Sequence, residues 1–168
     1  VAFNGRVLHG VTCLRGVNER LSAAPSLVIA GELVAASPGS ERPRSHHVAT
    51  ALSDGRLEPT LSFHAFDLYE ESGIDVLGRP YGERHARLVA LLGQDLPGVR
   101  VVETQVGDAA LAAARYREWV PHGRAEGIVV RSDRGLTYKV KPTFTVDLLV
   151  VAYGERLVDG TRSVAQRH

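Results

Sequence analysis

The sequence predicts an α+β fold in a single domain covering residues 1–168. Three β-branched runs near the C-terminus, residues 127–131, 136–141 and 147–153, are separated by turn residues, a pattern typical of an antiparallel meander. Two amphipathic helical segments and several other strand candidates precede these runs, without the regular alternation of a βαβ fold. With 168 residues, of which 44% are apolar, the chain is long enough to bury one hydrophobic core.

The N-terminal part of the chain predicts strands and loops. Val7 to Leu14 is rich in apolar residues and predicts a strand, followed by a turn at Gly16-Val17-Asn18. Residues 26–36 form a nearly continuous apolar run, which predicts one or two buried strands. Residues 37–59 are rich in Ser, Pro, Gly and Arg and predict a long surface loop. A further strand is expected over residues 61–69.

The middle of the chain predicts two helices joined by a short strand. After a turn at residues 75–80, Pro80 opens a helix that runs to Leu92, with leucines on one face and Arg84 on another. A strand is expected over residues 99–102. Asp108 is a good N-cap residue and predicts a second helix that ends at about Trp119.

Composition excludes several classes of protein. The net charge of +1 means that any contact with nucleic acid must come from a local patch. No apolar stretch reaches the roughly 18 residues that a membrane helix needs, so we expect no membrane association. Cys13 is the only cysteine, which excludes an internal disulfide and favours a reducing compartment. We therefore expect a cytoplasmic protein, and a monomer.

The pair of lysines at positions 139 and 141 is the most informative local feature. They are the only lysines in the chain, against eighteen arginines. On a strand, Lys139 and Lys141 point to the same face, where two ammonium groups repel each other unless an anion lies between them. Lysine binds phosphate as a point charge, so a nucleotide phosphate is the natural candidate. The alternative is a solvated strand edge protected by positive charges.

Glu126 lies just before the strand that leads to this pair. A hairpin formed by residues 127–131 and 136–141 can place Glu126 and both lysines around one pocket. A carboxylate beside two ammonium groups suits a metal–nucleotide complex, with the acid holding Mg²⁺ and the lysines holding phosphate. The alternative is a surface hairpin with cross-strand ion pairs.

Five short motifs then occur in a fixed order along the chain. They are Arg15-Gly16, Gly31-Glu32, Phe66-Asp67, Glu126-Gly127 with apolar residues after it, and Lys139-Val140-Lys141. In order and rough spacing they resemble the motifs of the ATP-dependent DNA ligases, within the covalent nucleotidyltransferase superfamily. The stretch from residue 63 to residue 88 is particularly similar to bacterial and archaeal DNA ligases.

The resemblance implies a nucleotidyltransferase adenylation domain, with antiparallel sheets flanked by helices around a nucleotide pocket. It implies that ATP is bound and converted to enzyme-linked AMP. Glu32 would bind the ribose hydroxyls and Phe66 would stack on adenine, although Phe66 could also be an ordinary core residue. Lys139 and Lys141 would contact the α-phosphate and stabilise the charge that develops as pyrophosphate leaves.

The resemblance also implies a metal ligand and a contact to nucleic acid. Glu126 would serve Mg²⁺, and Arg15 would meet the 5′-phosphate of nicked duplex DNA. For Arg15 the alternative is an ordinary surface arginine.

The nucleophile is the departure from the family pattern. These ligases attack the α-phosphate with the lysine of a Lys-x-Asp-Gly-x-Arg segment. Here Ala2-Phe3-Asn4-Gly5 stands at that place, Ala2 holds the lysine position, and Arg6, which we assign to nucleotide binding, follows one residue early. The lysine could have been replaced, the segment could be out of register, or the protein could be a degenerate relative. As written, the chain should not adenylate itself.

We expect an adenylation domain that is truncated at its N-terminus and lacks the C-terminal OB-fold domain of these ligases. Its function in an intact enzyme would be to form lysyl-AMP and to transfer AMP to a 5′-phosphate at a nick, while the fragment itself stays inactive. An RNA ligase and a non-catalytic nucleotide-binding or nucleic-acid-binding module remain as alternatives. A guanylyltransferase fits the stretch from residue 63 to residue 88 less well.

Overall fold

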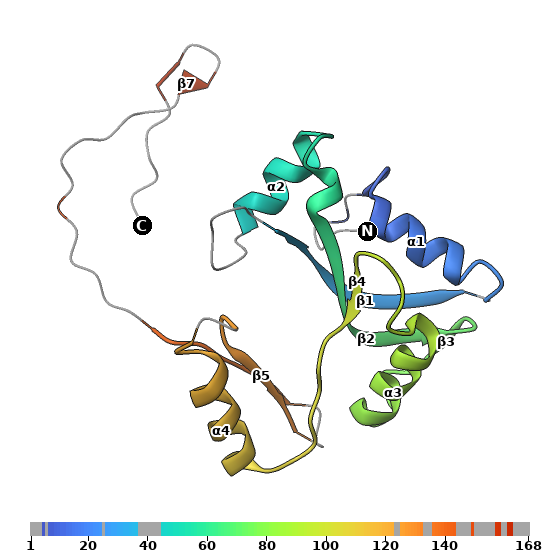
Figure 1. Ribbon diagram of the computed structural model, residues 1–168, viewed down its shortest axis with the longest axis vertical. Helices are drawn as coiled ribbons and strands as arrows, with labels where there is room; N and C mark the ends of the chain where they lie inside the picture. Colours follow the sequence, from blue (N-terminus) through green and yellow to red (C-terminus); the bar gives the residue numbers. More distant parts are fainter. Residues whose placement is uncertain are drawn as a thin grey trace.

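The computed structural model describes residues 5, 7–24, 26–36, 45–122, 125–132, 136–143, 149, 157–158 and 161–162. Helices and mostly antiparallel sheets are mixed along the chain, which confirms the α+β class (Figure 1). The elements are, in chain order, α1 Thr12–Arg20, β1 Leu27–Ala35, α2 Ser45–Ser53, the 3₁₀ turn η1 Glu58–Thr60, β2 Leu61–Glu71, β3 Ile74–Asp75, α3 Tyr81–Leu92, β4 Val99–Val101, α4 Ala109–Trp119, β5 Ile128–Arg131, β6 Thr137–Val140, β7 Leu157–Val158 and β8 Thr161–Arg162.

The largest sheet contains β1 to β4 and is called the main sheet below. Strand β2 pairs with β1 along its whole length and with β3 near its end, both antiparallel. Strand β4 also pairs with β2, but in parallel, with Phe63 opposite Val99. This parallel edge differs from the antiparallel sheets that we expected. Parallel neighbours need a long crossover connection, and here the connection contains α3.

The hydrophobic core lies on one face of the main sheet. Leu61 and Ala65 of β2 have the same inward orientation because they are an even number of residues apart. The three helices α1, α2 and α3 contribute to the same cluster, and Leu88 and Leu92 of α3 are completely buried. Figure 1 shows α4 apart from these helices, beside the hairpin of β5 and β6.

Helix α1 replaces a predicted strand. The strand expected over Val7 to Leu14 and the turn expected at Gly16-Val17-Asn18 are both wrong, because residues 12–20 are helical. Cys13 and Val17, one turn apart, are the buried residues of this helix. Val11 at the N-cap has no side chain that can bond the free amides. Glu58 of η1 does so instead, because its carboxylate accepts a hydrogen bond from the Thr12 amide.

Helix α2 lies within the segment that was expected to be a loop. The composition of residues 37–59 favours a loop, but residues 45–53 form a helix that packs against β1. Ala51 of this helix is 2% exposed and belongs to the core, with Val48 packed against the same cluster. The apolar stripe is only one turn long, so Ser, Pro and Arg on either side hide it in the sequence.

The other elements of the middle region confirm their predictions. Strands β2 and β4 and helices α3 and α4 lie where we expected them. The side chain of Asp108 caps α4 by accepting a hydrogen bond from the Leu111 amide at 2.9 Å. One residue of α3 was assigned to the wrong surface. Arg84 is only 8% exposed and points into the protein.

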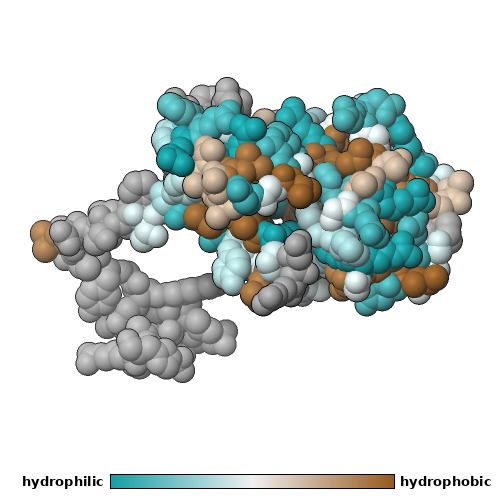
Figure 2. All heavy atoms as spheres, turned by 90° about the horizontal axis from the view of Figure 1, so that it is seen from below, coloured by the Kyte–Doolittle hydropathy of each residue, from teal (hydrophilic) through white to brown (hydrophobic). Residues whose placement is uncertain are grey.

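Strands β5 and β6 form an antiparallel hairpin, called the hairpin below, which confirms the first two strands of the expected meander. The third, residues 147–153, lies outside the described residues except for Leu149. Several apolar side chains of the hairpin are exposed, including Val129 and Tyr138 at 54% and 56%. On the face that Figure 2 presents, exposed apolar residues, in brown, lie between hydrophilic residues, in teal.

Strand β2 contains two single-residue irregularities in its pairing with β1. Ala30 pairs with Asp67 while Gly31 pairs with Ala65, so Phe66 has no partner in β1. Tyr69 is skipped in the same way near the end of the strand. Extra residues of this kind are β-bulges, which bend a strand and redirect a side chain, often next to a functional site.

None of the helices within the described part of the chain is long and apolar enough to pass through a membrane.

Candidate functional site

The face of the hairpin that carries the lysines is turned toward the main sheet. Residues directly opposite each other in an antiparallel pair lie on the same face, and so do residues two apart. Lys139 is opposite Val129, and Arg131 is two residues after Val129. The side chain of Arg131 contacts Asp67 of β2, with 3.0 Å between Nη1 and Oδ2. Lys139 therefore projects on the side of the hairpin that faces β2.

Glu126 and Lys141 form an ion pair at the open end of the hairpin. The pKa of Lys141 is raised, first because its ammonium group donates a hydrogen bond to Glu126. Lys139 of the hairpin and Glu32 of the main sheet also lie close enough to act on Lys141. The structure therefore brings together the three charged residues that the sequence assigned to one pocket, and Glu32 of β1, which the resemblance assigned to the ribose, lies near enough to influence Lys141.

Gly127 allows Lys141 to lie close to Glu126. A β-carbon at position 127 would collide with the carbonyl oxygen of Val140 and with the Cγ of Lys141. The glycine of the Glu126-Gly127 motif is thus required by packing, because the stem of Lys141 crosses the backbone at this point. Sequence reasoning gave this glycine no role.

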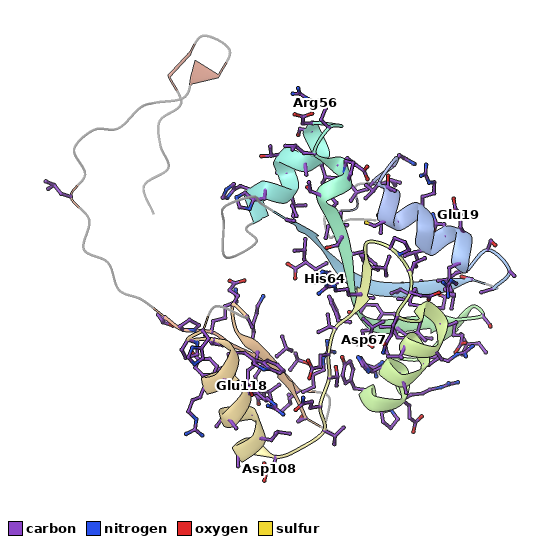
Figure 3. The ribbon with its side chains drawn as sticks, in the orientation of Figure 1. Glu19, Arg56, His64, Asp67, Asp108 and Glu118 are labelled. Carbon is purple, nitrogen blue, oxygen red and sulfur yellow. The ribbon has the colours of Figure 1, made fainter. Side chains whose placement is uncertain are left out.

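Glu32 lies midway along β1, at the edge of the main sheet, with its side chain exposed. It is directly opposite His64 of β2, which in turn is beside Arg100 of β4. His64, labelled in Figure 3, is half-buried. Its Nε2 is 3.1 Å from the hydroxyl of Ser62. Burial is the main reason that the pKa of His64 is lowered, and Arg100 lowers it further while Glu32 opposes the shift.

The glycine before Glu32 also has a packing role. The ring of Phe63 lies across Gly31, and a β-carbon there would overlap the ring and approach the carbonyl oxygen of His64. The Gly31-Glu32 motif therefore combines a close approach of two strands with an exposed carboxylate.

Phe66 occupies the first bulge of β2. Its carbonyl oxygen accepts a hydrogen bond from the hydroxyl of Tyr81 at 2.8 Å, which fixes the backbone at the bulge. The guanidinium carbon of Arg131 lies 5.9 Å from the centre of the Phe66 ring. Phe66 is half-buried, so it is neither an ordinary core residue nor a fully exposed one.

Sequence reasoning missed a buried charge cluster next to Phe66. Asp67 is 1% exposed, and both of its oxygens accept hydrogen bonds from Arg84, at 2.9 and 3.0 Å. Arg131 donates to the same carboxylate, and the Leu68 amide donates to it at 2.9 Å. Figure 3 shows Asp67 close to α3, from which Arg84 comes. The signal in the sequence was an aspartate within an apolar strand, because a buried carboxylate requires partners.

For three of the expected site residues the structure shows no position beside Glu126, Lys139 and Lys141. Ala2 and Arg6 lie outside the described residues. Arg15 lies on α1 with a side chain that is 71% exposed, and its Nε is 3.7 Å from the Glu19 carboxylate in the next turn. The structure therefore leaves the assignment of Arg15 to a 5′-phosphate as a prediction.

Glu126 is the residue that could serve a magnesium ion. Within the described residues no group of three or more His, Cys, Asp or Glu side chains could hold a metal ion. Mg²⁺ is commonly held by one or two carboxylates together with substrate phosphates. An exposed carboxylate beside two ammonium groups fits that mode of binding, in which phosphate oxygens supply the remaining ligands.

A shallow hollow of about 380 Å³ lies elsewhere, between α3 and β4. Its lining includes His85, Val89 and residues 99–104, and it contains none of the charged residues assigned to the nucleotide site. The charged side chains at the hairpin and Glu32 therefore lie outside this hollow.

The fold and the charged site are compatible with the adenylation domain of a covalent nucleotidyltransferase. A comparison with protein families is more specific, because the ATP dependent DNA ligase domain matches residues 9–143. The match covers most of the chain, so the chain belongs to this family.

Curated relatives agree with the family match. A probable DNA ligase of Streptomyces avermitilis is 31% identical over 145 residues, which cover 74% of this chain and 27% of that protein. A probable DNA ligase of Mycobacterium sp. (strain KMS) is 31% identical over 90% of this chain and 31% of its own length. A DNA ligase of Haloferax volcanii is 31% identical, with 74% and 24% covered. The chain thus spans about a quarter to a third of these relatives.

Proposed function

We propose that this chain is the nucleotide-binding part of an ATP-dependent DNA ligase. The convergence of Glu126, Lys139 and Lys141 on one side of a site, with Glu32 on the other, carries the proposal. A triphosphate needs positive charge and a nucleoside needs a polar partner for its ribose, and the two sides of the site supply these separately.

In this proposal each side chain has a defined task. Glu32 accepts hydrogen bonds from the ribose hydroxyls, and Phe66 stacks on adenine. Lys139 and Lys141 hold the α-phosphate, and Glu126 helps to hold Mg²⁺. Bound Mg²⁺ supplies charge neutralisation on the phosphates. The exposed guanidinium of Arg15 contacts the 5′-phosphate of nicked duplex DNA.

The ion pair between Glu126 and Lys141 has a consequence for this scheme. When phosphate enters, Lys141 turns from the carboxylate toward the phosphate, and Glu126 becomes available to a cation. The same pair therefore keeps the two side chains in place before the nucleotide arrives, so that less conformational freedom is lost on binding.

The chemical step requires a lysine nucleophile. Its amine attacks the α-phosphorus and loses a proton to water, the bond to the β-phosphate breaks, and pyrophosphate leaves. Ala2 stands where the family places this lysine, and an alanine side chain cannot form the phosphorus–nitrogen bond. The chain as written is therefore expected to bind ATP without forming lysyl-AMP.

Binding and transfer are tested separately. Titration of the chain with ATP and Mg²⁺ is expected to show binding that Lys139→Ala and Lys141→Ala each weaken, whereas Arg56→Ala, on an exposed ion pair with Asp54, leaves it unchanged. Incubation with α-labelled ATP is expected to give no adduct with the unmodified chain and a stable adduct with Ala2→Lys. A labelled adduct on the unmodified chain would falsify the assignment of the nucleophile.

A non-catalytic nucleotide-binding module is the second candidate, and Ala2 is the observation that favours it. If Ala2→Lys binds ATP but stays unlabelled, this candidate replaces the ligase. The names of the relatives favour DNA as the nucleic acid over the RNA alternative. Sealing assays on nicked DNA and nicked RNA, with a full-length relative as positive control, distinguish the two.

A further inference from the structure

Arg131 is the side chain that connects the hairpin to the main sheet. It is the last residue of β5, and its guanidinium crosses to Asp67 of β2. The guanidinium also lies over the Tyr81 ring of α3, with its carbon 4.3 Å from the ring centre. From these contacts we propose that Arg131 is a positioning residue that holds the two halves of the nucleotide site at a fixed separation. This rests on the proposed function.

The residues that Arg131 contacts, Asp67 and Tyr81, are held in place by other hydrogen bonds. Arg84 holds both oxygens of Asp67, and it also donates to the carbonyl oxygen of Leu77 at 3.1 Å. The hydroxyl of Tyr81 is bonded to the Phe66 carbonyl oxygen, so the ring on which Arg131 stacks is fixed as well. Arg131 therefore meets a surface that does not depend on Arg131 for its own geometry.

The charges show that Arg131 is not needed to neutralise Asp67. Arg84 and Asp67 already form a buried pair with no net charge. Arg131 adds a second cation to one carboxylate, with a side chain that is 25% exposed. A second cation at a neutral pair adds little to local stability, because partial desolvation opposes the Coulomb attraction. The contact is better explained by what it connects, and the Tyr81 ring adds a cation–π interaction at the same point.

Arg131 connects the two groups of residues that we assign to nucleotide binding. Glu32 and Phe66 belong to the main sheet, and Lys139 and Lys141 belong to the hairpin or follow it directly. ATP must contact both groups at once, whereas adenosine uses the first and tripolyphosphate uses the second. A ligand that bridges two sites gains affinity from their fixed spacing, and a ligand that contacts one site does not.

Arg131→Gln is therefore expected to weaken ATP selectively. We expect the dissociation constant for ATP with Mg²⁺ to rise at least about fivefold, the lower end of typical coupling effects. The binding of adenosine and of tripolyphosphate, each measured by chemical-shift titration, is expected to stay unchanged. Arg131→Lys keeps the charge but loses the planar guanidinium, so its affinity for ATP should fall between those of the unmodified chain and Arg131→Gln. Arg115→Gln is the matched control, because Arg115 also contacts an aromatic ring and a carboxylate, both in α4, and donates a further hydrogen bond to Gln105 just before that helix.

Adenosine and tripolyphosphate each test a different alternative to the positioning role of Arg131. An equal loss for adenosine would mean that Arg131 contacts the nucleoside directly, and a loss for tripolyphosphate would mean that it contacts phosphate directly. Either result overturns the positioning role. So does an unchanged affinity for ATP in Arg131→Gln.

A second measurement does not depend on nucleotide. Spin labels on cysteines introduced at Ile74 and Tyr138, which are 62% and 56% exposed, report the distance between the main sheet and the hairpin, while buried Cys13 stays unlabelled. We expect a narrow distance distribution that Arg131→Gln broadens and Arg115→Gln does not. An unchanged distribution overturns the positioning role. If the unmodified chain fails to bind ATP but the distribution broadens, the proposed function fails and the connection stands.

Discussion

The hydroxyl of Thr12 donates a hydrogen bond to the carboxylate of Glu58, which lies 46 residues later in the chain, at 2.9 Å. The backbone amide of Thr12 donates to the same carboxylate. Glu58 therefore performs at the start of α1 the role that an N-cap side chain usually performs from within the helix. It also places a negative charge at the positive end of the helix dipole.

Removal of this remote cap should destabilise the protein. Glu58→Ala leaves the Thr12 amide at the start of α1 without its acceptor, and we expect the free energy of unfolding to fall by about 1–2 kcal/mol. Urea denaturation followed by circular dichroism measures the change. Glu103→Ala, which removes an exposed carboxylate bonded to Gln105, serves as the control and should change stability little. Equal effects of the two substitutions would show that Glu58 is not a cap.

Substitution of Gly127 should affect both folding and binding. A methyl group there collides with the Val140 carbonyl oxygen and with the stem of Lys141. Gly127→Ala is expected to lower the free energy of unfolding by about 1–3 kcal/mol, because overpacking forces the backbone to move. It should also weaken ATP binding in a calorimetric titration. Gly78→Ala is the control, since no atom lies within 4 Å of a β-carbon there. Wild-type stability in Gly127→Ala would contradict the close approach.

The ion pair between Glu126 and Lys141 should be visible in a titration. The pKa of Lys141 is raised chiefly by its hydrogen bond to Glu126. A raised pKa in the folded state means that the stabilising effect of the pair is fully present below the ordinary lysine pKa of 10.5, and is lost as the pH rises through the folded value. Glu126→Gln should lower the pKa of Lys141, measured by NMR of its side chain. No change on substitution would exclude the pair in solution.

The cluster at Asp67 predicts an asymmetry between its members. Asp67→Asn leaves Arg84 and Arg131 facing each other without a carboxylate, and we expect a loss of about 3–5 kcal/mol in the free energy of unfolding. Arg131→Gln leaves the neutral pair of Arg84 and Asp67 intact and should cost clearly less. Thermal and urea unfolding of both variants tests this order. The reverse order would contradict the small contribution to stability that we assign to Arg131.

His64 should make stability sensitive to mild acid. Its pKa is lowered, mainly by burial, so the unfolded chain binds the proton more tightly than the folded protein does. The stabilising effect is therefore present above the ordinary pKa of 6.5 and is lost as the pH falls through the lower folded value. His64→Gln should flatten the dependence of unfolding free energy on pH in this range. His9→Gln, at an exposed position, is the control, and an equal flattening in it would contradict the assignment to His64.

The elements that could be predicted are those whose signals are local. Pro80 and Asp108 mark the starts of α3 and α4 in the sequence, and the cap of α4 is made by a residue within the same turn. Helix α1 could not be predicted because its cap comes from Glu58, far along the chain. Helix α2 is short and has a single buried face, which only the contact with β1 reveals.

The candidate site was predictable to a similar extent. The spacing of Lys139 and Lys141 and the return of the hairpin were enough to predict that the lysine pair lies beside Glu126, and Lys141 is the lysine that contacts it. The contact of Arg131 with Asp67 spans 64 residues and joins two separate sheets, so no periodicity in the sequence reports it. The bulge at Phe66 was missed for the same reason, since it exists only relative to the pairing partner β1.

The two extra residues of β2 limit how this segment can change in length. Removal of Phe66 alone would leave Ala65 and Asp67 as direct neighbours opposite Gly31 and Ala30, a regular ladder in which both keep their faces but the bend is erased. Removal of a paired residue instead would exchange inside for outside along the rest of the strand and carry Asp67 away from its guanidinium partners. Single-codon deletions at paired positions of β2 should therefore be far less tolerated than deletion of an extra residue.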